Sequence, residues 1–326
     1  MHMGEFDLIK RYFKRPAVKA ALGVGDDCAL LQPAVGMQLA ISCDMLVEGR
    51  HFLPTVEPRH LGHKALAVNL SDLAACGAKP SAFTLALALP RADEAWLAPF
   101  SEGLLALADQ HGCELVGGDT TRGPLNICIT VFGELPTGQA LLRSGARPGD
   151  DLYVSGTLGD ARLALEAFRG TLSLPQAVFE QARLRMERPE PRVALGIALR
   201  GIASAAVDIS DGLLGDLQHV LTASGVGARI DAPMALGLMA SAAADFEPHR
   251  WLPQALQLEY VLAGGDDYEL LFTAPPSARG AVTGASIQAR TVVTRIGRIE
   301  AEPGLRVMGA DGAPLSVRYG AFDHFA

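Results

Sequence analysis

The chain has 326 residues, of which 49% are hydrophobic and 20% are charged. This length exceeds the usual size of a single hydrophobic core, so we expect two domains, and the composition argues against disorder. With 36 acidic against 28 basic residues the formal charge is −8, which disfavours a broad electrostatic grip on nucleic acid. A phosphate ligand would therefore need metal ions or a few local basic groups.

Cysteine usage and hydropathy predict a cytoplasmic protein. The five cysteines are odd in number and never occur in a CxxC spacing, which is typical of a reducing compartment. The start of the chain lacks an apolar signal core, and the longest apolar stretches are too short to span a bilayer. We therefore expect neither a membrane nor nucleic acid among its partners.

Both halves of the chain alternate predicted helices with predicted strands, so the predicted fold class is mixed α/β. In the first half, helices are expected over 5–13, 60–76 and 94–110, and strands over 38–42, 83–89, 115–116 and 126–135. In the second half, strands are expected over 152–155, 205–207, 228–231, 269–273 and 291–299, with helices between them. The segment 136–150 is rich in Gly, Pro and Arg and predicts the boundary between domains 1–139 and 140–326.

Six aspartates lie in short segments scattered along the chain, flanked mostly by Gly or Ser. If the fold brings them together, their mutual repulsion requires that cations lie between them or that several take up protons. Oxygen ligands of this kind favour Mg²⁺, which usually keeps waters and is completed by substrate phosphates. The set predicts a metal-dependent phosphate enzyme and consists of Asp27, Asp44, Asp72, Asp119, Asp208 and Asp211.

Each segment also has an ordinary structural interpretation. The turn at 23–27 fails as a dinucleotide loop because Cys28 replaces the third glycine. The segment from Asp208 begins like a calcium loop, but Gly212 stands where an oxygen ligand is needed. Ser210 or Asp211 could instead cap a helix starting near residue 213, and such a helix N-terminus also attracts phosphate.

The segment Gly117–Pro124, GGDTTRGP, combines two glycines, a carboxylate, two hydroxyls and a guanidinium, which favours a functional loop over a plain surface loop. By contrast, three other candidates have strong structural interpretations. His51 could be a structural histidine, the acidic segment 264–267 an ordinary β-turn, and Arg143 a solvated linker residue. Taken singly, these residues would remain unassigned.

Eight motifs in one order carry more information than any one of them. They are GEFDLIKRYF, GVGDDCALL, KALAVNLSDLAACGAKP, LVGGDTTRGP, LLRSGARPGD, AVDISDGLLGDL, GGDDYELLF and the final AFDHF. In this order and over nearly the whole chain, the sequence resembles the thiamine-monophosphate kinase family of the aminoimidazole ribonucleotide synthetase-like superfamily. Members of that family transfer the γ-phosphoryl group of ATP directly to thiamine monophosphate.

The resemblance implies a role for each matching residue. The six aspartates would hold several Mg²⁺ ions, helped by Ser42 and by the residue at Cys43. Contacts with ATP are implied for Gly118, Asp119, Arg143 and Ser210, and contacts with the thiamine substrate for His51, Asp266 and Phe322. The resemblance also implies a two-domain fold and a homodimer in which the N-terminal strands of two copies form a barrel.

Two residues depart from the family pattern. Asp266 replaces the usual Glu and is one methylene shorter, and Cys43 replaces a common Thr, although a thiol is a poor Mg²⁺ ligand. Two alternatives stay open at this stage. One is another ATP-using synthetase of the superfamily, and the other is a non-catalytic metal- or ligand-binding relative.

Overall fold

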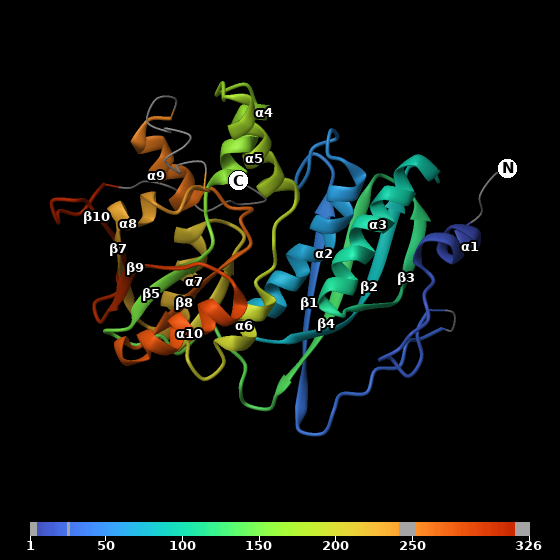
Figure 1. The fold of residues 1–326 in the computed structure, drawn as a ribbon, viewed down its shortest axis with the longest axis horizontal. Coiled ribbons are helices and arrows are strands. Elements are labelled where there is room, and N and C mark those ends of the chain that lie inside the picture. The colour runs from blue at the N-terminus through green and yellow to red at the C-terminus, as the bar shows by residue number, and fades with distance from the viewer. Residues whose placement is uncertain (1–4, 25–26, 241–251, 317–326) are drawn as a thin grey trace. The chain divides into compact units, whose positions relative to one another are not determined.

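The structure, a computed structural model, describes residues 5–24, 27–240 and 252–316 (Figure 1). The chain divides into two compact units. Unit 1 contains residues 1–73 and 78–138, and unit 2 contains residues 74–77 and 139–326. No helix in the described part of the chain is long and apolar enough to cross a membrane.

Unit 1 is built on a four-stranded sheet with the strand order β1-β4-β2-β3. The strands are β1 (Met37–Val47), β2 (Lys79–Leu89), β3 (Glu114–Arg122) and β4 (Asn126–Pro136). β1 is antiparallel to β4 along its whole length, from Met37 opposite Pro136 to Val47 opposite Asn126. β2 runs antiparallel to β4 and parallel to β3, so β1 and β3 form the two edges.

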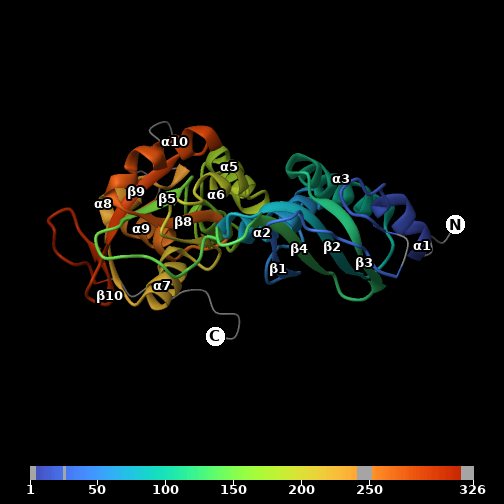
Figure 2. The same cartoon turned by 90° about the horizontal axis from the view of Figure 1, so that it is seen from below.

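Two long helices of unit 1, α2 (Pro58–Ala75) and α3 (Glu94–His111), pack closely on each other. A Cβ at Gly62 of α2 would lie 2.0 Å from the Phe100 carbonyl oxygen of α3, so this crossing requires glycine. Most residues of α2 are buried, including the polar Lys64, Asn69 and Ser71. Figure 2 shows α3 on one side of the sheet. The chain enters unit 1 through α1 (Glu5–Leu8) and the π-helical turn η1 (Ile9–Phe13).

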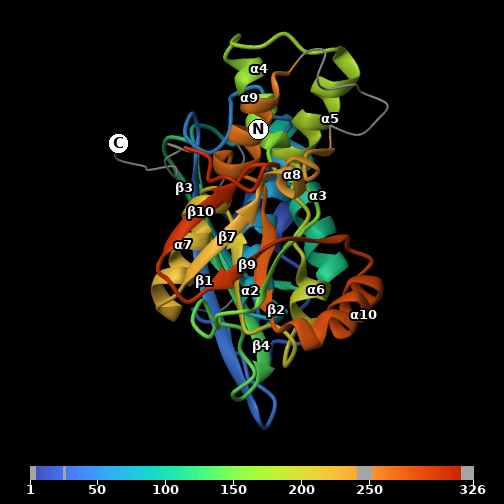
Figure 3. The same cartoon turned by 90° about the vertical axis from the view of Figure 1, so that its left-hand side faces the viewer.

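Unit 2 contains a six-stranded mixed sheet with the order β10-β7-β9-β5-β8-β6, whose β10, β7 and β9 strands face the viewer in Figure 3. The strands are β5 (Asp151–Ser155), β6 (Ala205–Ile209), β7 (Gly227–Asp231), β8 (Glu269–Ala274), β9 (Val293–Glu300) and β10 (Gly304–Met308). Every residue of β5, β6 and β8 is buried, so both faces of this part of the sheet are covered.

The helical elements of unit 2 connect these strands. They are α4 (Asp160–Phe168), α5 (Gln176–Glu187), α6 (Val193–Ala198), α7 (Leu213–Ser224), α8 (Ala232–Leu236), α9 (Gln254–Ala263), the short turn η5 (Pro276–Ala278) and α10 (Arg279–Ala289). α7 follows β6 directly and ends at Gly225 in the left-handed conformation, a common helix stop.

The predicted mixed α/β class is confirmed, but two strands were predicted too short at site residues and one strand was missed. β1 continues to Val47, so Asp44 lies inside a strand and not beyond its end. β3 runs to Arg122, so Asp119 is a strand residue and not a loop residue. β10 was not predicted at all. In all three places, pairing with a neighbouring strand extends the sheet beyond the local sequence signal.

Candidate functional site

Unit 1 brings three of the predicted metal-binding residues together between β1 and α2. Ser42 and Asp44 alternate along β1 and therefore point to the same face. The Ser42 hydroxyl donates a hydrogen bond to Asp72 Oδ2 of α2. The Asp44 backbone N–H donates to Asn69 Oδ1, one turn earlier on the same helix, at 3.0 Å. This group therefore holds two carboxylates and a hydroxyl, all oxygen donors.

Cys43 lies between these residues in sequence but faces the other side of β1. Its Sγ lies 3.5 Å from Cys128 Sγ on β4, and its side chain is exposed. Burial raises the pKa of the Cys128 thiol to about 11, and contact with Cys43 adds to the effect. The Cys43 thiol is therefore separated from the Ser42, Asp44 and Asp72 group by the strand itself.

His51 closes a tight turn just after β1. Its ring Nδ1 accepts a hydrogen bond from the Val47 backbone N–H at 3.0 Å, and its backbone N–H donates to the Val47 carbonyl oxygen at 2.9 Å. In the neutral ring the proton must then reside on Nε2. Lys64 of α2 donates to the His51 carbonyl oxygen at 3.3 Å and ties this turn to the helix.

Gly118 and Asp119 lie on the edge strand β3. Gly118 has φ 145°, and a Cβ there would lie only 1.9 Å from the Leu85 carbonyl oxygen, so glycine permits close approach of β2 and β3. Asp119 is exposed and lines a cavity of about 40 Å³ with Gly118 and Phe13. Asp27 is exposed, between the bridged residues Leu22 and Leu30 in sequence.

Unit 2 brings a second acidic group together where β6 ends and α7 begins. Asp208 is a buried residue of β6, and Ser210 and Asp211 follow in the turn. The predicted side-chain cap was wrong, because Gly212 is the N-cap and makes no side-chain bond. Asp216 Oδ2 instead accepts hydrogen bonds from the backbone N–H groups of Ser210, Asp211 and Gly212, at 3.0, 3.0 and 3.1 Å.

Asp216 was missed by the sequence analysis. Its only sequence signal was an acidic residue in the first turn of a predicted helix, which occurs in many helices. Burial raises the pKa of Asp216 to about 7, the charge of Asp211 adds to the shift, and the three amide hydrogen bonds oppose it.

The loop 264–268 packs directly on this turn. The Asp266 N–H donates to the Ser210 carbonyl oxygen at 2.7 Å, and the Tyr268 N–H donates to the Ile209 carbonyl oxygen at 2.8 Å. Asp266 and Tyr268 both have left-handed backbones, with φ of 62° and 52°. Non-glycine residues in this region carry strain that is common at functional sites. The fold thus brings Asp266 to the turn that carries Asp208, Ser210 and Asp211.

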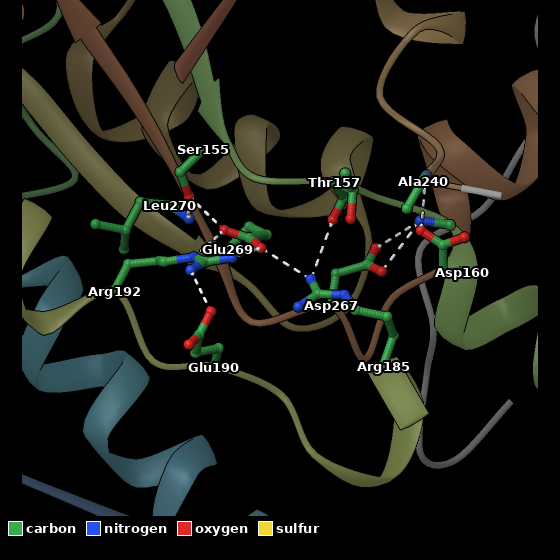
Figure 4. A network of polar contacts seen from close by, with 11 residues as sticks. Ser155, Thr157, Asp160, Arg185, Glu190, Arg192, Ala240, Asp267, Glu269 and Leu270 are labelled. Atoms are coloured by element: carbon green, nitrogen blue, oxygen red, sulfur yellow. Dashed lines mark hydrogen bonds and ion pairs between the residues drawn. The ribbon is translucent and has the colours of Figure 1, made fainter. Parts of the chain in front are cut away.

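A buried ionic network fixes the strand that follows this loop (Figure 4). The side chain of Glu269 is fully buried and accepts hydrogen bonds from Arg192 Nε and Nη2, both at 2.6 Å. Arg185 Nη2 donates to Glu269 at 2.8 Å, and the Ser155 hydroxyl donates to it at 2.6 Å. Two guanidinium groups therefore face one carboxylate, and Glu190 on the other side of Arg192 accepts a bond at 2.8 Å.

Asp267 points inward from the same loop (Figure 4). Its two oxygens accept the Gly159 N–H at 3.0 and 3.2 Å, at the start of α4. Burial raises the pKa of Asp267 well above its ordinary range, against the opposing effects of the Gly159 N–H and the Arg185 charge. Asp267 is thus an internal anchor, although its neighbour Asp266 was the residue singled out by sequence.

Arg143 lies at the other end of α7 from the acidic turn. Ser224, the last residue of this helix, donates to the Arg143 carbonyl oxygen at 3.3 Å. A 12-residue helix is about 18 Å long, so the fold of unit 2 does not place Arg143 next to Ser210. Phe322 lies outside the described residues.

Within each unit, the predicted cation-binding carboxylates form a small group. Among residues 5–24, 27–240 and 252–316, no set of three or more His, Cys, Asp or Glu side chains is arranged to hold a metal ion by itself. Unit 1 supplies Asp44 and Asp72, and unit 2 supplies Asp208 and Asp211. Two carboxylates per group suit an ion such as Mg²⁺, which keeps several waters and is completed by phosphate oxygens.

Comparison with known proteins places this fold in a defined class. Residues 25–135 match the N-terminal domain, and residues 147–310 the C-terminal domain, of AIR synthase related proteins. The chain is therefore a two-domain protein of the AIR synthase related class.

Full-length relatives narrow the class further. The chain is 46% identical to thiamine-monophosphate kinase of Salmonella typhimurium, covering 100% of this chain and 99% of the relative. It is 45% identical to the solved thiamine-monophosphate kinase of Stenotrophomonas maltophilia, with a TM-score of 0.82 over 94% of this chain and 95% of that one. This chain belongs to the thiamine-monophosphate kinase family.

One further solved relative carries bound molecules. The structure of AaThiL complexed with AMPPCP and TMP is 31% identical, with a TM-score of 0.75 and coverage of 88% of each chain.

Proposed function

We propose that this protein transfers the γ-phosphoryl group of ATP to thiamine monophosphate, with direct in-line displacement, giving thiamine diphosphate and ADP. The observation that carries the proposal is the full-length similarity to thiamine-monophosphate kinases, together with a relative complexed with AMPPCP and TMP. AMPPCP resembles ATP, with a carbon atom in place of the last bridging oxygen. The two acidic groups of this chain fit a reaction between two phosphates.

The oxygen-only donors support Mg²⁺ as the cofactor. Asp44 and Asp72 with Ser42 would hold cations from unit 1, and Asp208 and Asp211 would hold them from unit 2. Asp27 and Asp119 are exposed carboxylates that would add to the first group, and Cys43 could add only its backbone carbonyl oxygen. When bound, Mg²⁺ neutralises phosphate charge and aligns donor with acceptor.

We assign binding of the two substrates to the other predicted site residues. Gly118, Asp119, Ser210 and Arg143 would contact ATP, with Arg143 reaching a part of the nucleotide remote from the acidic turn. His51, Asp266 and Phe322 would contact thiamine monophosphate. The loop bearing Asp266 is held by backbone hydrogen bonds against Ser210 and Ile209, so its carboxylate enters the site on a fixed support.

The chemistry asks little of a general base. The acceptor oxygen belongs to a phosphate that is already ionised near neutral pH, so no proton must be removed before attack. Charge repulsion between the two phosphates is the main obstacle. A site built from carboxylates that recruit cations is suited to this obstacle.

We also propose a homodimer formed through the sheet of unit 1. β1 is an edge strand of 11 residues, and Leu39, Ile41 and Met45 on its outer face are 37%, 61% and 52% exposed. A long apolar edge strand is prone to pair with another chain. A second copy pairing there would close the two sheets into a barrel.

Product analysis tests the proposed function. Purified protein with Mg²⁺, ATP and thiamine monophosphate should form thiamine diphosphate and ADP in equal amounts, which phosphorus NMR can follow. Release of inorganic phosphate without a diphosphate product would instead favour a synthetase of the same class. A complete absence of nucleotide turnover would favour a non-catalytic relative.

The five free cysteines fit a reducing compartment, and we assign the reaction to the cytoplasm.

A further inference from the structure

The backbone of the acidic turn in unit 2 is organised around one oxygen atom. Asp216 Oδ2 accepts the N–H groups of three consecutive residues, Ser210, Asp211 and Gly212. These amides precede the first residue of α7, where a helix N-terminus ordinarily leaves N–H groups without partners and attracts anions. Here the carboxylate of Asp216, from the first turn of the same helix, accepts the three N–H groups in place of an external anion.

The turn is also confined on its other side. Gly212 has φ 115°, and a Cβ there would lie 3.0 Å from the Ala263 carbonyl carbon at the end of α9. A Cβ at Gly265 would lie 2.8 Å from the Ser210 carbonyl oxygen. The turn is therefore held between the 264–268 loop and the Asp216 carboxylate, which is itself only 3% exposed. Moving or removing the oxygen would free three amides at once.

We propose that Asp216 is a positioning residue: its Oδ2 sets the backbone path of the turn and thereby the spacing at which Asp208 and Asp211 bind divalent cations. The inference rests on the proposed function and extends it to a residue outside the cation and substrate contacts assigned above. Asp216 acts through the three amides and is not itself a cation ligand, because the oxygen that faces the turn is already surrounded by N–H donors.

This role differs from direct metal binding in what each substitution should do. Asp216→Asn keeps an acceptor oxygen of the same reach but removes the charge. Asp216→Glu keeps an ionisable carboxyl group but moves the oxygen by one methylene, and Asp216→Ala removes the oxygen. A positioning role requires Asn to be tolerated and Glu and Ala to be harmful. A cation ligand would show the opposite preference for Glu over Asn.

The test measures Mn²⁺ binding to the full-length protein by titration calorimetry, without ATP or thiamine monophosphate. Asp216→Asn should bind within about threefold of wild type, because the acceptor survives. Asp216→Glu and Asp216→Ala should bind about 10- to 100-fold more weakly, as expected when support around a metal site is lost. Equal loss in Asn and Ala, or wild-type binding in Glu, overturns the proposal.

Asp150→Ala is the matched control. Asp150 is also buried and accepts the Arg147 N–H at 3.0 Å and the Ser204 hydroxyl at 2.6 Å, at the opposite end of β6 from Asp208. It should lose stability and keep Mn²⁺ affinity. If Asp216→Ala does not fold, the comparison of Asn with Glu decides alone.

A steady-state Mg²⁺ titration with both substrates gives a second readout. The Glu variant should raise the half-saturating Mg²⁺ concentration by about tenfold or more. The Asn variant should keep this concentration near that of wild type. An unchanged Mg²⁺ requirement in the Glu variant contradicts positioning even if turnover falls. Should wild type show no turnover at all, the proposed function fails, yet the Mn²⁺ affinities of the variants still test the role of Asp216.

Discussion

The guanidinium of Arg192 meets the carboxylate of Glu269 through two parallel hydrogen bonds, Nε to Oε2 and Nη2 to Oε1, each of 2.6 Å. Glu269 has no exposed side-chain surface and Arg192 has 13%. Glu269 is the first residue of strand β8, directly after the loop that carries Asp266 and Asp267. A buried, bidentate pair at this point fixes the base of the loop.

Removing one partner of this pair should be costly. Arg192→Met leaves Glu269 buried with only Arg185 and Ser155, and breaking a buried pair in this way costs about 3–5 kcal/mol. Urea unfolding would measure the loss. Arg298→Met is the matched control. Arg298 is 57% exposed and makes a long ion pair of 4.0 Å with Glu300, so its loss should cost under about 1 kcal/mol. Equal effects from both substitutions would mean that the buried pair contributes no more than a surface pair.

Two adjacent glycines should respond differently to alanine. Gly118→Ala would force a Cβ to within 1.9 Å of the Leu85 carbonyl oxygen at a φ of 145°, so β3 must separate from β2, costing about 1–3 kcal/mol or more. Gly117→Ala meets only Thr84 Cγ2 at 3.8 Å and should melt near the wild-type temperature. Thermal unfolding followed by circular dichroism checks both. A Gly118→Ala protein that melts with wild type would show that the strand approach is not rigid.

Asp267 should make stability depend on pH. Its pKa is raised by burial, so between the unfolded value of about 4 and the folded value the native state holds a proton that the unfolded chain has lost. Its stabilising contribution is complete below the unfolded pKa and is lost as pH rises through the folded pKa, at up to about 1.4 kcal/mol per pH unit.

The measurement compares wild type with Asp267→Asn by urea unfolding at pH 5 and pH 8. Asparagine can still accept the Gly159 N–H but does not titrate. The unfolding free energy of the variant minus that of wild type should therefore increase from pH 5 to pH 8. Taking this difference cancels other titrating groups. A difference that stays constant or decreases contradicts the assignment of a buried, protonated Asp267.

The outer face of β1 gives a prediction about assembly. Ile41→Glu places a charge on the exposed apolar face of the edge strand and should convert a dimer of twice 34.3 kDa into monomers. Leu184→Glu, on an exposed position of α5, is the control and should leave the mass unchanged. Sedimentation equilibrium distinguishes the two. A wild-type protein that is monomeric at micromolar concentration would remove the basis for the barrel.

The helices and most strands could be predicted from periodicity, but side-chain partners could not. Periodicity placed α2, because helical spacing depends on neighbours within one helix. Asp44 and Asp119 were expected just past the ends of short strands. Asp is uncommon within strands, but pairing with β4 and β2 keeps both residues in the sheet.

The supporting contacts lie further from the reach of sequence patterns. Glu269 is separated from Arg192 by 77 residues and from Ser155 by 114, so no local pattern could connect them. Asp216 lies only a few residues from its partners, but they are backbone amides, which leave no signature in the side-chain sequence. Within each unit, the folded chain was needed to show how the acidic groups are held.

The most direct test of the central claim uses the variants Asp72→Asn and Asp208→Asn. For each variant, the rate of thiamine diphosphate formation and the free energy of unfolding are measured. If these carboxylates recruit the cations that let two phosphates meet, each substitution should abolish formation of thiamine diphosphate while leaving the unfolding free energy of the metal-free protein equal or higher, since a repelling charge is removed. Thiamine diphosphate formation at the wild-type rate by either variant, with the same Mg²⁺ requirement, would contradict the account.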